Sequence, residues 1–128
     1  MDQRTHLRID PRLVGVVEEI GAGTARVTLR ALPEMTADER GLVHGGFTFG
    51  LADYAAMCAV NDPNVVLGGA ETRFLAPVAD GQTMVATATV EAEKGRKRTV
   101  AVAVAVDGKD VMTGTFTCFV LDGHVLDG

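Results

Sequence analysis

Residues 41–60 read GLVHGGFTFGLADYAAMCAV, a segment around which the rest of the chain is expected to fold. From Phe47 to Val60 the side chains are apolar almost all the way round a helix, which predicts a buried helix and not a surface one. Several are small enough to let neighbouring backbone come close: Gly50, Ala52, Ala55, Ala56 and Ala59. The run Asn61-Asp62-Pro63-Asn64 then ends the helix, because proline cannot continue it.

Short β-prone runs flank this helix on both sides. Two precede it, separated by Gly21-Ala22-Gly23, and in the second of them apolar and polar residues alternate, which is typical of a hairpin with one wet face. Four more follow it. The run that begins at Arg98 has valine and alanine on both faces and is expected to be central in a sheet. The six predicted strands are Leu13–Ile20, Thr24–Ala31, Val65–Leu75, Gln82–Glu93, Arg98–Val106 and Val111–Leu121.

Three connecting segments carry local signals. Pro33–Gly41 is polar, and the capping-box spacing of Thr36–Glu39 within it predicts a single helical turn. Asp107–Asp110 is interpreted as a hairpin turn. The near-repeat of Val-Leu-Asp-Gly within Val120–Gly128 is too short for a structural unit and is interpreted as a frayed tail.

The order β-β-α-β-β-β-β predicts an α+β domain with one antiparallel sheet and one long apolar helix. It occupies residues 1–128 as a single domain, because 128 residues leave no room for a second core. One curved sheet wraps only one side of the helix, and the apolar Ala/Val strands leave further surface uncovered. Exposed apolar surface of that extent is unusual in a monomer, so we expect an obligate homodimer or a dimer of dimers.

Composition argues against several classes of function. A net charge of −5, with no Trp, one Tyr and five Phe, does not suit nucleic-acid binding, which needs basic surface and stacking aromatics. No apolar run reaches the ~20 residues that cross a bilayer, and Met1–Asp10 lacks the features of a signal peptide, so we expect a soluble cytoplasmic protein with no membrane partner. Cys58 and Cys118 look like core residues, and neither they nor the histidines have zinc-site spacing, so no metal is expected.

The strongest chemical signal lies where the helix begins, at His44-Gly45-Gly46. The first N–H groups of a helix have no intrahelical partner and carry the positive end of the helix dipole. Two glycines leave these groups uncovered. The segment can therefore bind an anion or stabilise a developing oxyanion.

Asp53 is the second signal, because it is the only charged residue between Phe47 and Val60. Burying an unpaired carboxylate is costly and needs a compensating reason. One reason is catalysis, since a desolvated carboxylate becomes a stronger nucleophile or general base. The other is a structural hydrogen bond to a neighbouring strand or subunit. The helical pattern leaves both explanations open.

These residues resemble the hotdog-fold acyl-CoA thioesterases of the phenylacetyl-CoA thioesterase (PaaI-like) type. The resemblance rests on GLVHGG at 41–46, on Asp53 nine residues after the histidine, and on RFLAPV at 73–78. It implies the hotdog fold, one curved antiparallel sheet wrapped around a long central helix, with active sites built across a dimer interface. It also implies that the Gly45 N–H polarises the thioester carbonyl and that His44 orients the loop or contacts the thioester. Asp53 of the neighbouring subunit then acts as nucleophile or as general base on a water.

Two positions depart from the pattern of this family. Many relatives carry Asn or Gln six residues before the histidine to hold substrate or water, and this chain has Asp38. That carboxylate either raises the pKa of Asp53 or points to solvent. Some relatives place Ser or Thr in the strand after the helix to hold the attacking water, and this chain has Leu67. The departures leave open a weak thioesterase, a different water-holding group, or an acyl-CoA binder that does not hydrolyse.

A basic cluster, Lys94-Gly95-Arg96-Lys97-Arg98, lies in a turn between two predicted strands. Arg and Lys suit phosphate oxygens, so the turn either grips the phosphates of coenzyme A or is an ordinary solvated turn. On the first interpretation, substrate contacts come from Arg96, Lys97 and Arg98, in addition to Gly46 and Asp38 at the helix start.

The predicted function is hydrolysis of a small or medium acyl-CoA thioester to free acid and coenzyme A, with no cofactor beyond the coenzyme A of the substrate. The alternative is a non-catalytic acyl-CoA-binding hotdog protein that serves as sensor or carrier. A hotdog enoyl-CoA hydratase would need a histidine a few residues after Asp53, and this chain has none there.

Overall fold

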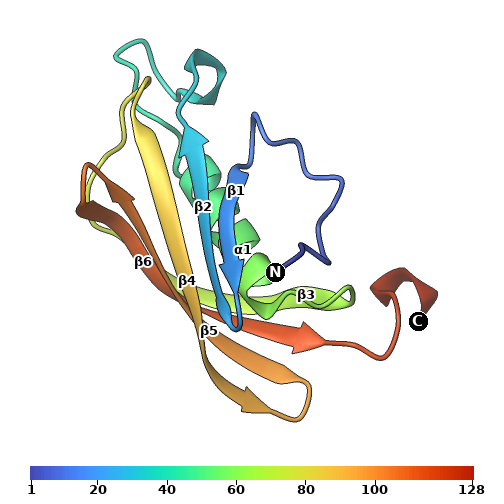
Figure 1. The fold of residues 1–128 in the computed structure, drawn as a ribbon. Coiled ribbons are helices and arrows are strands. Elements are labelled where there is room, and N and C mark those ends of the chain that lie inside the picture. Colours follow the sequence, from blue (N-terminus) through green and yellow to red (C-terminus); the bar gives the residue numbers. More distant parts are fainter.

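The computed structural model describes residues 1–128 as one sheet curved around one helix (Figure 1). All sheet neighbours are antiparallel, in the order β1-β2-β4-β5-β6-β3. This confirms the predicted fold and its β-β-α-β-β-β-β order. The elements are β1 (Val16–Gly21), β2 (Thr24–Arg30), the 3-10 turn η1 (Pro33–Met35), α1 (Gly45–Val60), β3 (Val65–Phe74), β4 (Thr83–Lys94), β5 (Lys97–Val106), β6 (Lys109–Val120) and the 3-10 turn η2 (Val125–Asp127).

Alternation along the strands creates the core between the sheet and α1. In β5 the valines are buried and the alanines between them are half-buried, because successive side chains point to opposite faces. The strand lies between β4 and β6, as its dry faces predict. The helix-facing side chains of the sheet include Met84, Val100, Val104 and Phe116, all fully buried. Phe49, Gly50 and Asp53 of α1 are only half-buried, so the sheet leaves one side of the helix partly uncovered.

The prediction of a helical turn at Thr36–Glu39 is wrong. The helical turn in this loop is η1, which starts earlier, at Pro33, a residue whose fixed φ suits a helix start. Thr36 is already extended (φ −82°, ψ 143°) and forms a β-bridge with Val43. The loop after it is organised by the side chain of Asp38 and not by a second helical turn.

Other boundaries shift by a few residues. α1 begins at Gly45, two residues before the predicted Phe47, because glycine at 45 and 46 does not prevent the helical conformation at its first turn. β1 begins at Val16, after Gly15, whose φ of 149° breaks the predicted strand. The chain end is not frayed throughout: His124 Nδ1 accepts the N–H of Leu126 (3.1 Å) and caps η2.

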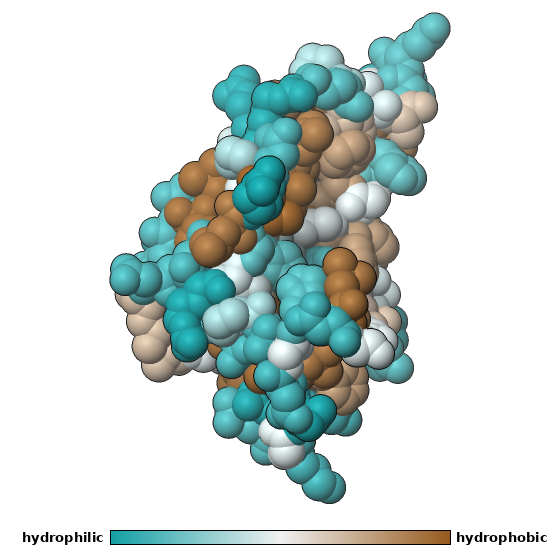
Figure 2. Space-filling model, turned by 90° about the vertical axis from the view of Figure 1, so that its right-hand side faces the viewer, coloured by the Kyte–Doolittle hydropathy of each residue, from teal (hydrophilic) through white to brown (hydrophobic).

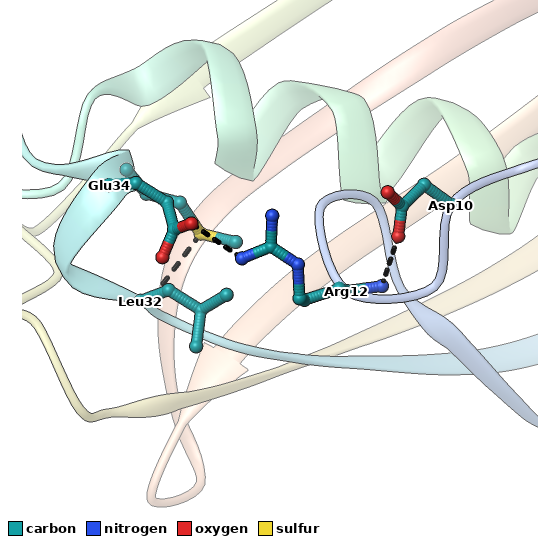
Figure 3. A network of polar contacts seen from close by, with 5 residues as sticks. Asp10, Arg12, Leu32 and Glu34 are labelled. Atoms are coloured by element: carbon teal, nitrogen blue, oxygen red, sulfur yellow. Dashed lines mark hydrogen bonds and ion pairs between the residues drawn. The ribbon is translucent and has the colours of Figure 1, made fainter.

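The N-terminal segment before β1 is fastened at both ends. Asn61 ends α1 in a left-handed conformation (φ 53°), and its side chain bonds the N–H of Arg4 (2.7 Å) and the C=O of Asp2 (2.9 Å). At the other end, Arg12 forms an ion pair with Glu34 of η1, as Figure 3 shows. The segment is therefore part of the fold.

The surface and the thiols add three observations. The cysteines are free thiols in the core, as expected. None of the helices combines the length and the apolarity that crossing a membrane would require. The face seen in Figure 2 carries brown hydrophobic side chains between teal hydrophilic ones, and the exposed large hydrophobic residues of the chain include Leu42, Phe74 and Leu75.

Candidate active site

α1 begins with its first N–H groups uncapped. His44, the residue before the helix, is extended (φ −65°, ψ 129°), and no side chain caps the helix start. The preceding loop is held on both sides: the His44 N–H donates to the C=O of Met35, and the Val43 N–H donates to that of Val78, each at 2.9 Å. The Phe47 N–H donates to the C=O of His44 (3.1 Å), so the backbone is fixed in place while the N–H groups of Gly45 and Gly46 stay available to a ligand.

Two aromatic rings pack closely against the two glycines at the start of the helix. A Cβ at Gly45 would lie 3.2 Å from Cε1 of Phe74, and a Cβ at Gly46 would lie 3.1 Å from the His44 ring. His44, Gly45 and Gly46 thus lie with one of these rings at the start of α1. Phe74 joins them, a residue to which the sequence interpretation gave no role although it lies inside the RFLAPV segment.

A cleft of about 340 Å³ opens beside the start of the helix. Its wall is mostly apolar, and the segment after β3 forms one side of it. An apolar cleft that ends on free N–H groups suits a ligand with a hydrocarbon part and a polarisable carbonyl. The lining residues are Val43, Gly45, Thr48, Phe74, Leu75, Ala76, Pro77, Val78 and Val111.

Asp53 lies on the third turn of α1 with one carboxylate oxygen buried and unpartnered. Its Oδ1 has no hydrogen-bond partner, and burial raises the pKa of its carboxyl group. The pKa of Cys118 in β6 rises to about 11, through burial and then through the negative charge of Asp53, so the two groups are near enough for their charges to interact. A bond from Oδ1 to a strand of the same chain is therefore absent, and of the two structural explanations only a contact with another subunit remains.

Gly45 and Asp53 are too far apart to act on one thioester from the same chain. They are eight residues apart in one helix, which at 1.5 Å per residue is about 12 Å. Reacting groups need to approach to about 3–3.5 Å. The two halves of the predicted catalytic pair are present, and a single chain does not join them.

Asp38 and Leu67 are the two departures from the family pattern. Asp38 Oδ1 accepts the backbone N–H groups of Arg40 (2.9 Å) and Leu42 (3.1 Å), so this oxygen holds its own loop. Burial, and not Asp38, raises the pKa of Asp53. Leu67 is half-buried and lies opposite Cys118 in the β3–β6 register, next to the thiol that neighbours Asp53. No hydroxyl is supplied at that position.

The basic turn lies at the other end of the sheet from the start of the helix. β4 begins next to the loop that holds the helix start and ends eleven residues later at Lys94, about 36 Å along the strand. Arg96 forms an ion pair with Asp122, and Arg98 Nε lies 3.1 Å from Glu93 Oε1, while Lys97 forms no ion pair. Within one chain the turn does not reach the cleft.

The amino-acid sequence matches the model of a known protein family. Residues 40–113 match the model described as Thioesterase superfamily, a region that includes the start of the helix, Asp53 and the strands from β3 to β5. The chain belongs to the thioesterase superfamily. Its sheet order and central helix are those of the hotdog fold shared by its structural neighbours.

Solved structures of this superfamily fold superpose closely. An uncharacterized protein, PH1136 of Pyrococcus horikoshii, is 52% identical with a TM-score of 0.98, covering 99% of this chain and 98% of that one. A mutant form of the phenylacetic acid degradation protein PaaI of Thermus thermophilus is 30% identical with a TM-score of 0.78, covering 85% and 95%. A hypothetical thioesterase of Streptococcus pneumoniae, solved with coenzyme A, shares the fold at 19% identity and a TM-score of 0.77, covering 85% and 87%.

One curated relative is much longer than this thioesterase-superfamily chain. A protein named methylthioribose-1-phosphate isomerase of Aquifex aeolicus is 46% identical over 123 residues, which are 95% of this chain and 27% of that relative. The chain thus spans about a quarter of the relative's length. The isomerase name describes that whole protein, most of which has no counterpart here.

Proposed function

We propose that this protein is an acyl-CoA thioesterase of the PaaI-like type, which hydrolyses a small or medium acyl-CoA to the free acid and coenzyme A. The observation that carries the proposal is the buried, unpartnered Oδ1 of Asp53, on a helix whose N–H end is also unpartnered. Membership of the thioesterase superfamily supports this activity at the level of the reaction class.

A second copy joins the two halves of the site. β3 is an edge strand, and Phe74 at its end lies against Gly45, while Leu67 near its start lies opposite Cys118, the neighbour of Asp53. If β3 pairs antiparallel with β3 of a second copy, the start of one strand lies beside the end of the other. Asp53 of one copy then approaches Gly45 of the other, which supports the expected homodimer.

The reaction follows from these two groups. The Gly45 N–H donates to the thioester oxygen, on which negative charge develops in the transition state. As general base, Asp53 takes a proton from water, and the water oxygen bonds to the carbonyl carbon. The C–S bond then breaks, and the departing thiolate takes that proton from Asp53. As nucleophile, an Asp53 oxygen bonds to the carbonyl carbon as the C–S bond breaks and coenzyme A leaves as thiolate; water then hydrolyses the mixed anhydride, which releases the acid, restores the Asp53 carboxylate and supplies the proton that the thiolate takes up. Burial favours both routes because it makes the carboxylate more basic.

The same pairing assigns places to the other predicted substrate contacts. Val120, opposite Val65 at the start of β3, donates its N–H to the C=O of Arg96 (2.8 Å), so the basic turn lies at that end of the sheet. In the dimer this turn is about three strand spacings, roughly 15 Å, from the other copy's β3 end. Arg96, Lys97 and Arg98 then face the phosphates of coenzyme A. Gly46 and His44 border the thioester, and Asp38 lies next to the cleft.

A non-catalytic acyl-CoA-binding protein is the second candidate. It is favoured by Leu67, which offers no hydroxyl to hold a water, and by Asp38 Oδ1, which is occupied by the loop N–H groups of Arg40 and Leu42. A binder would retain affinity for acyl-CoA without releasing thiol.

A panel of acyl-CoAs followed by free-thiol release separates the two candidates. We expect thiol release by the native protein and its loss, by a factor of about 10² or more, in Asp53→Ala with the assembly state unchanged. Glu91→Ala, an exposed carboxylate of β4, is the matched control with native turnover. Binding of every acyl-CoA without thiol release would support the binder, and full activity of Asp53→Ala would end the catalytic assignment.

A further inference from the structure

The edge strand β3 is unusually open for its length. It is ten residues long and pairs only with β6, so one row of its backbone groups has no partner in the sheet. The strand is exposed from Gly68 to its end except at Thr72, which is half-buried. Phe74, its last residue, and Leu75 after it have more than half of their surface exposed. An exposed edge of this kind invites another strand.

Glu71 and Arg73 place opposite charges on one face of this edge. Their β6 partners in register are Thr115 and Thr113, whereas the neighbouring Ala70 lies opposite the buried Phe116, so the two charged residues point away from α1. No ion pair of the chain includes either of them. The two charges are thus close together in one strand and unpaired.

The space around them is polar and open. A groove of about 810 Å³ runs along Glu71–Arg73 and Thr113–Thr115, and none of its lining residues is hydrophobic. Charged side chains from another molecule can therefore enter this groove and remain next to the hydroxyl groups of its threonines.

A second copy of this chain has the complementary charges in the required order. In a two-fold contact, residue i of one copy meets residue j of the other, and j meets i. Glu71 and Arg73 are two residues apart near the middle of the exposed part of β3, so antiparallel pairing brings each beside the opposite charge of the other copy, directly or diagonally. The catalytic site requires Leu67 of one copy to lie near Phe74 of the other. With that pairing, the two-fold axis passes close to Glu71 and Arg73.

We propose that Glu71 and Arg73 form reciprocal ion pairs with Arg73 and Glu71 of a second copy and thereby set the register of β3 against β3. The inference rests on the proposed function only for the side-by-side arrangement of the two strands. The register controls catalysis because a slip of one residue turns each side chain to the other face and moves Asp53 away from the opposite Gly45.

Charge reversal and mixing test the proposal. Glu71→Arg makes all four charges at the axis positive, and Arg73→Glu makes all four negative, so each variant alone is expected to dimerise at least about tenfold more weakly in sedimentation. In a one-to-one mixture, the two positive side chains of the first variant face the two negative side chains of the second. The mixture is therefore expected to recover the native dimer.

Matched variants and outcomes complete the design. Glu91→Arg and Arg30→Glu, exposed residues of β4 and β2, carry the same charge changes away from β3 and should dimerise like the native chain. The chain with both reversals, Glu71→Arg and Arg73→Glu together, should also dimerise, which shows that both positions tolerate either residue. Native dimerisation of the single variants, or a mixture that stays monomeric, would overturn the proposal. Sedimentation needs no substrate, so a recovered dimer without thioesterase activity would count against the proposed function alone.

Discussion

Gly45 and Asp53 occupy one helix about 12 Å apart, and both carry polar groups that the chain itself leaves without a partner. Neither end of this pair stabilises the isolated fold. The uncapped N–H groups and the buried carboxylate become useful only when a ligand and a second helix are present.

Two inactive variants should complement each other. Asp53→Asn removes the attacking group, and Gly45→Val blocks the N–H side of the site, so each alone should lose turnover. In a heterodimer, one site combines Gly45 of the first variant with Asp53 of the second and is intact. Random mixing should restore about a quarter of native thiol release. A mixture as inactive as its components would show that the site does not draw on two copies.

The difference in stability between the Asp53→Asn variant and the native protein should grow in favour of the variant as the pH rises. Burial raises the pKa of Asp53 above the ordinary value of about 3.9, so folding favours the neutral acid. This contribution is present below the ordinary pKa and is lost as the pH rises through the raised pKa. The Tm of Asp53→Asn minus that of the native protein should therefore be constant at low pH and then increase. A difference that does not change from about pH 3 to about pH 8 would contradict burial of the charge.

Adding one methyl group at Gly45 should slow the reaction through Phe74. A Cβ there lies 3.2 Å from the ring, so the ring or the helix start must shift by a few tenths of an ångström. We expect kcat/KM of Gly45→Ala to fall about 10- to 100-fold, because the N–H is displaced from the oxyanion. Phe74→Leu in the same chain should recover part of the loss. Gly50→Ala, whose Cβ meets nothing within 4 Å, is the control and should keep native kcat/KM.

The basic turn should affect KM only for substrates that carry phosphates. We expect Arg96→Ala and Arg98→Ala to raise KM for an acyl-CoA about three- to tenfold with kcat unchanged, since charge-assisted bonds to phosphate are lost. A phosphate-free thioester of N-acetylcysteamine should show no change in KM. Asp122→Ala, which releases Arg96 from its ion pair, should lower KM for acyl-CoA or leave it unchanged. Equal effects on both substrates would assign the arginines a structural role.

Local patterns were sufficient to predict the helix, the strands and a single antiparallel sheet, and the resemblance to a known family implied the hotdog fold. The apolar run after Phe47 predicted the buried helix, and strict alternation in β4 and β5 predicted strands, because both periodicities depend on nearest neighbours along the chain. The turn at Thr36–Glu39 was predicted wrongly because its capping signal competed with a β-bridge to Val43, a contact seven residues away. The contact of Phe74 with Gly45 joins segments 29 residues apart, and no local pattern indicates it.

For the candidate site, the amino-acid sequence alone identified the chemical groups, since a lone carboxylate in an apolar helix and two glycines at its start are visible as residue types. Their relative position required the folded chain. The rise of an α-helix separates Gly45 from Asp53, and the sheet order leaves β3 as the edge along which a second copy can bring them together. Sequence spacing measures distance along one chain, whereas this site depends on which edge of the sheet stays unpaired.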